Sequence, residues 1–85
     1  MNSYTTRRFR EAYAVLPEAV RWRARHAYKL FRQNPGHPSL QFKKVNDGNV
    51  YSVRVGLGYR ALGVLEGSEI AWFWIGPHAE YERLI

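Results

Sequence analysis

The stretch from Val50 to Ile85 limits the fold most, because it predicts three short strands joined by two tight turns. Tight turns between consecutive strands favour an antiparallel meander. The expected segments are strand 50–55, turn 56–58, strand 59–65, turn 66–68 and strand 70–75. Gly76-Pro77 breaks the last strand, and we expect residues 78–85 to form a short terminal helix.

Residues in the expected strands alternate in a way that separates two faces. In 50–55, Val50, Ser52 and Arg54 share one face, and the residues between them share the other. Residues 70–75, IAWFWI, are apolar on both faces, which is typical of a strand that is covered on both sides. The meander is therefore expected to pack its apolar face against another layer of structure.

The first half of the chain predicts that second layer as two short helices. Apolar residues recur at helical spacing from Arg7 to Leu16, and again after Pro17. Pro17 suits the first turn of the second helix, and Asn34-Pro35-Gly36 ends it. The apolar stripes are Phe9, Ala12, Tyr13 and Leu16, then Val20, Ala24, Ala27 and Phe31. Residues 3–6 are expected to form a short strand and residues 36–49 a loop.

The chain is expected to be one α+β domain spanning residues 1–85, with an N-terminal αα-hairpin packed on a small antiparallel sheet. It has no cysteine, which excludes disulfides, thiolate metal sites and cysteine nucleophiles. The three histidines have no metal-ligand spacing, so we expect neither a metal nor a cofactor. No apolar run approaches ~20 residues and no signal peptide is evident, so a cytoplasmic location without membrane contact is expected.

Positive charge is the strongest compositional signal. Thirteen Lys and Arg against seven Asp and Glu give a formal net charge of +6, and ten of the thirteen are arginine. Arginine binds phosphate or carboxylate in a forked geometry. The charge predicts a polyanionic or acidic partner, either nucleic acid or an acidic protein, and charge alone does not separate these.

The hairpin contains Tyr51-Ser-Val-Arg54-Val followed by Gly58-Tyr-Arg60-Ala-Leu. This pattern resembles the hairpin motif of the RelE/ParE toxin family of bacterial toxin–antitoxin pairs. Trp74-Ile-Gly-Pro-His78-Ala-Glu-Tyr81 resembles its C-terminal motif. The resemblance covers nearly the whole chain and implies a RelE-like fold. It implies one of two activities, because RelE-like members cleave mRNA on the ribosome and ParE-like members poison DNA gyrase.

A nuclease reading implies roles for six residues. RNA cleavage needs a proton taken from the 2′-hydroxyl, a proton given to the 5′ oxygen, and stabilisation of charge on phosphorus. By resemblance, Arg60 stabilises the transition state, His78 is the general acid or base, and Tyr81 stacks on a base or assists proton transfer. Arg54, Lys43 and Lys44 are expected to contact RNA phosphates.

Each role has a structural alternative. Arg60 is otherwise a solvated strand residue or the partner of Glu66 or Glu69, and Arg54 a solvated neighbour. His78 is otherwise a cap after the turn, and Tyr81 packs over the sheet edge. Lys43 and Lys44 are otherwise a solvated loop, and Trp72, Phe73 and Trp74 are mostly core, with at most one free to stack on a base.

The chain also departs from the family. Ser52 stands where several ribosome-dependent nucleases place a lysine, and no carboxylate lies in or directly beside the hairpin to act as general base. His78 would then act alone, or the chain is slow or inactive. The open functions are an mRNA endoribonuclease that inhibits translation, a gyrase inhibitor, and an inactive binder. All three imply an acidic antitoxin, which would lie along Arg21, Arg25, Lys29 and Arg32 of the second helix or cover the sheet.

Overall fold

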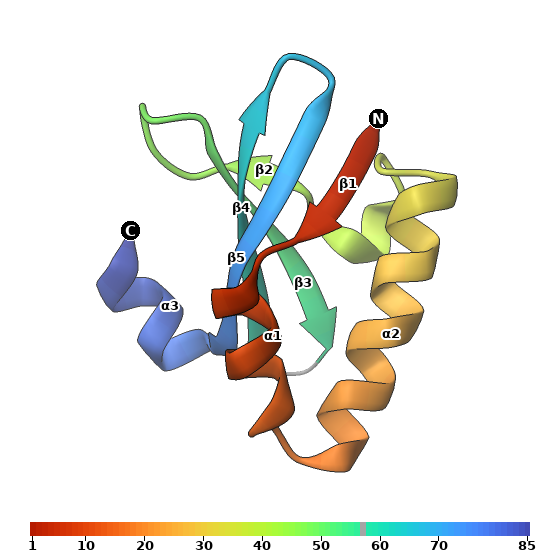
Figure 1. The fold of residues 1–85 in the computed structure, drawn as a ribbon, viewed down its shortest axis with the longest axis vertical. Helices are drawn as coiled ribbons and strands as arrows, with labels where there is room; N and C mark the ends of the chain where they lie inside the picture. The colour runs from red at the N-terminus through yellow and green to blue at the C-terminus, as the bar shows by residue number, and fades with distance from the viewer. Residues whose placement is uncertain (57) are drawn as a thin grey trace.

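A computed structural model describes residues 1–56 and 58–85. Figure 1 shows two helices on one side of a twisted sheet and a third, C-terminal helix on the other side. The elements in chain order are β1 (Asn2–Thr5), α1 (Arg7–Ala14), α2 (Glu18–Gln33), a 3-10 turn η1 (Pro38–Leu40), β2 (Lys43–Lys44), β3 (Val50–Gly56), β4 (Tyr59–Glu66), β5 (Glu69–Pro77) and α3 (His78–Leu84). The α+β fold and the helical hairpin expected from the sequence are confirmed.

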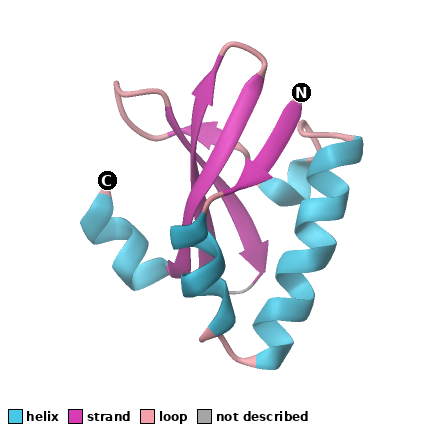
Figure 2. Cartoon of the chain, viewed as in Figure 1, coloured by secondary structure: helices cyan, strands magenta, loops and turns pink. Residues whose placement is uncertain are grey.

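The sheet has five strands in the order β1-β5-β4-β3-β2 (Figure 2). The antiparallel meander β3-β4-β5 forms its centre, as predicted. β1 adds to one edge in parallel with β5. β2 lies within the predicted loop 36–49 and pairs with Tyr51 and Ser52. Among the described residues, no strand pairs with residues 53–56 of β3 on that side, so this part of β3 is an open edge. The predicted turn at 56–58 includes Leu57, which lies outside the described residues.

The helix ends follow from local chemistry. Thr6 caps α1, where its Oγ1 accepts a hydrogen bond of 3.2 Å from the backbone N–H of Phe9. α1 ends at Ala14, two residues before the predicted Leu16, because a residue that precedes a proline is disfavoured in helical geometry. Pro17 is the N-cap of α2 rather than part of its first turn, and Glu18 follows near the positive end of the helix dipole.

The core lies between the helical hairpin and one face of the sheet. Phe31 of α2 is 2% exposed and makes edge-to-face contacts with Phe42 and Trp72, at centroid distances of 5.0 and 5.3 Å. Tyr51, Val53 and Val55 contribute the β3 part of this core. The predicted stripe joins it through the following residues: Phe9, Ala12, Tyr13, Leu16, Ala24, Ala27 and Phe31.

A bulge in β5 places its tryptophans on opposite faces. The pairing of β4 with β5 shifts after Leu62, so Leu62 pairs with Trp74 and Gly63 pairs with Trp72. Phe73 is the extra residue. Trp72 therefore joins the core under the helices, while Trp74 lies on the face that carries Ser52. The apolar run IAWFWI is covered on the helical side and partly covered on the other, as its composition predicted.

No helix within the described residues is long and apolar enough to cross a membrane.

Candidate functional site

The candidate site lies on the face of the sheet opposite the helical hairpin. Ser52 and Arg54 alternate with the core residues of β3, so they point to this face. Arg60 of β4 pairs directly with Arg54 and shares its face. α3, which carries His78 and Tyr81, packs on the same side against β4 and β5 (Figure 1). The predicted residues Arg54, Arg60, His78 and Tyr81 are thus brought together.

Arg60 is the centre of this cluster and is only 4% exposed. Its Nη1 donates to Gln41 Oε1 at 3.1 Å, and its Nη2 donates to the Gln41 backbone oxygen at 3.1 Å and to Ser52 Oγ at 2.9 Å. Arg60 is therefore not a solvated strand residue, and its hydrogen bonds do not go to Glu66 or Glu69. Among the described residues, its Nε is buried without a hydrogen-bond partner.

The electrostatic setting of Arg60 is unusual for a buried arginine. Charged side chains are almost never fully buried unless they are paired. Within residues 1–56 and 58–85 no carboxylate forms an ion pair with Arg60. Burial lowers the pKa of Arg60 from its ordinary value, Tyr81 opposes this, and the charge of Arg54 adds to the lowering. Because arginine is not deprotonated in proteins at neutral pH, the guanidinium remains a cation whose charge is not cancelled.

Tyr81 covers the guanidinium. Its ring centroid lies 5.2 Å from Arg60 Cζ, within the range of a cation–π contact. Its hydroxyl donates to Ser52 Oγ at 3.3 Å, and the residue is 3% exposed. The ring thus packs over the sheet, as the structural alternative for Tyr81 expected, but it does so on top of the candidate catalytic arginine. The structural role expected for Tyr81, packing over the sheet, is therefore compatible with a role at the candidate site.

His78 begins α3 and is exposed, in contrast to Arg60 and Tyr81. Its backbone N–H donates to the Gly58 oxygen at 2.7 Å, so the residue does have a structural role at the turn. Its Nε2 lies 2.8 Å from Glu82 Oε1, one helical turn away. The imidazole is 5.3 Å from the ring of Tyr81. The side chain thus combines an imidazole ring with a carboxylate that can orient it.

The remaining predicted contacts lie around this centre. Arg54 is half-buried and directly opposite Arg60 in the pairing of β3 with β4. Lys43 pairs with Ser52 and therefore shares the site face, whereas Lys44 pairs with Tyr51 and belongs to the other face. Both lysines are exposed. Of the two, Lys43 is placed to extend the basic surface of the site.

Trp74 is half-buried on the site face, beside Arg60. A Cβ built on Gly76, the residue that pairs with Arg60, would lie 2.6 Å from the Trp74 ring. The indole thus covers the backbone next to the arginine. Trp74, rather than the buried Trp72, is the tryptophan that is placed to stack on a base.

Sequence reasoning missed three residues of the site. Gln41 is 19 positions from Arg60 and lies in the segment predicted as loop. Ser52 was noted as a departure from the family, but not as an acceptor for Arg60 and Tyr81. Glu82 lies in α3, outside the hairpin in which a general base was expected. Its i, i+4 spacing from His78 was the available signal.

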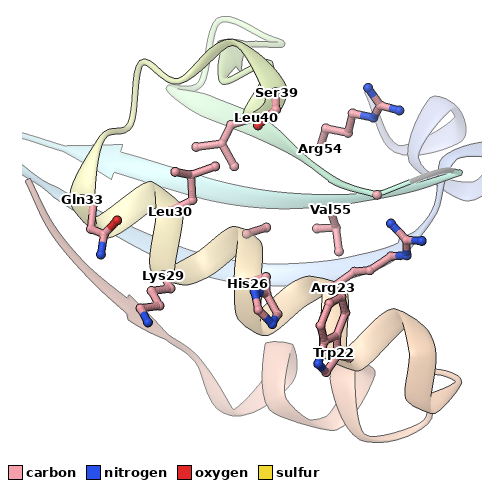
Figure 3. A pocket seen from close by; sticks show the side chains of 12 residues that line it. Trp22, Arg23, His26, Lys29, Leu30, Gln33, Ser39, Leu40, Arg54 and Val55 are labelled. Atoms are coloured by element: carbon pink, nitrogen blue, oxygen red, sulfur yellow. The ribbon is translucent and has the colours of Figure 1, made fainter.

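A hollow with a volume of about 550 Å³ lies between α2 and the open edge of β3. Figure 3 shows Trp22, Arg23 and His26 projecting from α2 beside Val55 of β3. Lys29 and Arg54 complete its basic lining, and its described lining includes no carboxylate. Trp22 is 53% exposed, and its ring contacts that of His26 in a tilted arrangement with 4.0 Å between ring centroids. Around the helix, three of the four residues of the predicted basic flank, Arg25, Lys29 and Arg32, line one surface hollow. The fourth, Arg21, donates from Nη1 to the Ala14 backbone oxygen at 3.1 Å. We call the hollow between α2 and β3 the α2–β3 groove.

Within the described parts of the chain, no three His, Asp or Glu side chains come together as ligands would.

Solved structures of bacterial and archaeal toxins share this fold. The RelE–RelB complex of Methanococcus jannaschii contains a chain that superposes with a TM-score of 0.75 at 18% identity, over 95% of this chain and 96% of that one. YafQ of E. coli matches with a TM-score of 0.74 at 9% identity, over 94% and 96%. The isolated RelE toxin of E. coli matches with a TM-score of 0.68 at 13% identity, over 99% and 98%. At these identities the likeness shows the fold.

The family itself is shown by sequence. The profile of the ParE-like toxin domain matches residues 18–83, most of the chain. The protein therefore belongs to the ParE-like toxin family, within the RelE/ParE superfamily of toxin–antitoxin toxins. No curated protein matches the chain by sequence.

Proposed function

We propose that the protein is a metal-independent endoribonuclease that cleaves mRNA in the cytoplasm and so inhibits translation. One observation carries this proposal. Arg60, a buried cation without a carboxylate partner among the described residues, lies within one cluster with Tyr81, which in turn contacts the titratable His78. A gyrase inhibitor has no need for proton-transfer groups beside a phosphate-binding charge.

Arg60 supplies the charge stabilisation. Attack of the 2′ oxygen on phosphorus places additional negative charge on the phosphoryl oxygens, and a fixed cation in a water-poor site stabilises that charge strongly. The guanidinium is already oriented by its hydrogen bonds to Gln41 and Ser52. Because Tyr81 covers it, the ring has to turn aside before a phosphoryl oxygen reaches the guanidinium.

His78 transfers the proton. It is exposed, it lies one residue after the strand that borders Arg60, and imidazole titrates near neutral pH. Glu82 holds Nε2 at 2.8 Å, which leaves Nδ1 to act on the substrate. The carboxylate thereby fixes the orientation of the ring. The hairpin has no carboxylate to act as general base, and the pair of His78 and Glu82 takes that role in this proposal.

RNA is held by the groups around this centre. Arg54 and Lys43 share the site face on the β3–β2 side of Arg60 and bind neighbouring phosphates there, and the exposed Lys44 of β2 adds a further positive charge nearby. Trp74 provides a flat apolar surface for a base. The codon or sequence preference would follow from these contacts on the intact ribosome.

An acidic antitoxin is the proposed partner. The matched archaeal RelE chains were solved in complexes with RelB. In this protein the α2–β3 groove and the basic flank of α2 have the charge to receive an acidic segment, and the exposed Trp22 gives it an apolar contact. Binding there would lie beside Arg54 and so reach the edge of the site.

Induced expression followed by mapping of mRNA 5′ ends tests the function. We expect growth arrest, new 5′ ends within translated mRNA, and neither effect from Arg60→Ala produced at the same level. Arrest without new 5′ ends, together with inhibited DNA supercoiling by gyrase, would replace the nuclease with the gyrase alternative. No arrest from the parent would leave an inactive, antitoxin-binding member of the family.

A further inference from the structure

Gln41 supplies two of the three hydrogen bonds that hold Arg60. The amide Oε1 accepts from Nη1, and the backbone oxygen accepts from Nη2, both at 3.1 Å. Ser52 accepts the third from Nη2. A guanidinium held at both terminal nitrogens by one residue has little freedom to rotate about its own axis. Gln41 therefore fixes the plane of the group, and Ser52 adds a single further contact.

The backbone of Gln41 is held in an uncommon conformation. Its φ and ψ are 46° and 45°, in the left-handed region, where it ends the turn Pro38–Leu40. Glycine or asparagine would occupy that region at lower cost. However, glycine has no side chain and that of asparagine is one methylene shorter. Only the longer glutamine side chain places a second acceptor on the guanidinium in addition to the backbone oxygen of residue 41. Backbone strain of this kind is concentrated at functional sites.

The acceptors around Arg60 share one chemical property, which is that all are neutral. An amide oxygen, a backbone oxygen and a hydroxyl orient the guanidinium without cancelling its charge. A buried arginine that needed only to be stable would ordinarily be paired with Asp or Glu. A carboxylate at position 41 would neutralise the cation that an arriving phosphate needs, because the two negative groups would compete for the same charge.

We propose that Gln41 is a positioning residue that fixes the guanidinium of Arg60 for transition-state stabilisation while leaving its positive charge uncancelled. This inference rests on the proposed nuclease function. It assigns to a loop residue outside both sequence motifs a requirement for both shape and neutrality. Glutamate has the length of glutamine and so keeps the shape, but it carries a negative charge. Gln41→Glu therefore tests the requirement for neutrality separately from the requirement for shape.

The test compares Gln41→Glu with Asn46→Asp and the parent. Both variants change an amide into a carboxylate and lower the net charge equally. Asn46 is exposed, and an aspartate retains its acceptor for the Gly48 N–H. We expect Gln41→Glu to remain folded, with a melting temperature equal to or above that of the parent. Its single-turnover cleavage should nevertheless be slower by about 10²-fold, as when an oxyanion-stabilising donor is lost. Asn46→Asp should cleave like the parent.

A merely structural Gln41 predicts the opposite pattern. Gln41→Glu would then cleave at the rate of Asn46→Asp, and that result overturns the proposal. A second readout does not depend on cleavage. In ¹⁵N-labelled parent, the Nη protons of Arg60 should give separate, slowly exchanging NMR signals, because both nitrogens are held. Gln41→Ala should merge or broaden them while the folded amide spectrum is retained.

Unchanged Nη signals in Gln41→Ala would overturn the positioning role directly. If the parent cleaves no mRNA but the Nη signals behave as expected, the proposed function fails and only the anchoring of Arg60 stands. If the parent cleaves and Gln41→Glu cleaves equally well, the nuclease function stands and this inference fails. The two failures are therefore distinguishable.

Discussion

Tyr81 lies directly over Arg60, with 5.2 Å between the centre of its ring and the guanidinium carbon. The contact joins the C-terminal helix to the central strand of the sheet, and the tyrosine hydroxyl adds a hydrogen bond to Ser52. The buried Arg60 and Tyr81, both candidate catalytic residues, thus pack against each other between α3 and the sheet. The predictions that follow concern this contact and the hydrophobic core on the other face of the sheet.

Arg60→Ala should slow cleavage by about 10²–10³-fold, as expected when a group that stabilises developing negative charge is removed. Because the interaction strengthens in the transition state, ribosome binding should change far less than the cleavage rate. Arg60→Lys should recover only part of the loss, since an ammonium cannot reach the acceptors of Gln41 and Ser52 as a planar fork does. Single-turnover rates and binding constants, measured on the same ribosome complexes, check this. Equal losses in binding and rate would count against a transition-state role.

His78→Ala should reduce the cleavage rate by about 10²–10⁴-fold and flatten the pH–rate profile near neutrality, if the imidazole transfers a proton. Glu82→Gln retains an acceptor for Nε2 but removes the negative charge. It should therefore cause a smaller loss than His78→Ala. The measurement is the cleavage rate between pH 5.5 and 8.5 for the three proteins. A His78→Ala variant with the parent's rate and profile would rule out the proton-transfer role.

The sequence predicted the main helices and strands because each of them carries a local signal. The strand alternation, the glycine turns and the helical stripes are all short-range patterns, and the meander and hairpin follow from them. The strand β1 was expected, but its parallel pairing with β5 depends on contacts more than 60 residues apart. β2 has only two residues, Lys43 and Lys44, too few for any periodic pattern.

The candidate site was only partly predictable for a related reason. Motif positions identified Arg54, Arg60, His78 and Tyr81, and the sheet register brings them together. The burial of Arg60 and its neutral acceptors were not predictable, because Gln41 reaches it through a left-handed turn in an irregular segment. The roles of these residues remain predictions until cleavage is measured.

Phe31→Ala should lower the free energy of unfolding by about 3–5 kcal/mol. Phe31 is 2% exposed and contacts both Phe42 and Trp72, so its removal leaves a cavity between α2 and the sheet. Val15→Ala is the control, because Val15 is 83% exposed and should change stability little. Urea denaturation of the three proteins measures the difference. A loss below about 1 kcal/mol for Phe31→Ala would contradict a core centred on this residue.

Gly76→Ala should destabilise the protein by about 1–3 kcal/mol, because the new methyl group must displace a packed side chain. The added Cβ would lie 2.6 Å from the indole of Trp74. The matched background is Trp74→Leu, which lacks the indole ring. In that background, Gly76→Ala should lower the free energy of unfolding by clearly less. Denaturation of the four proteins in this double-mutant cycle gives the coupling. An equal cost in both backgrounds would show that the indole is not the obstacle.

Antitoxin binding should weaken as salt rises, mainly through a slower association rate. The net charge of +6 and the basic lining of the α2–β3 groove are the physical reason. Arg23→Gln should reduce the salt dependence, whereas Arg83→Gln, on the C-terminal helix, should change it little. Stopped-flow or surface-based kinetics with the purified antitoxin make the comparison. An association rate that is constant between low and high salt would exclude electrostatic recognition at the groove.

Single-turnover cleavage of mRNA bound to the ribosome tests the central claim most directly. The account predicts that the purified parent cuts the mRNA without added metal ion, and that Arg60→Ala, at equal ribosome occupancy, cuts it about 10²–10³-fold more slowly. A parent protein that binds the ribosome complex and leaves the mRNA intact, or an Arg60→Ala variant that cuts as fast as the parent, would contradict it.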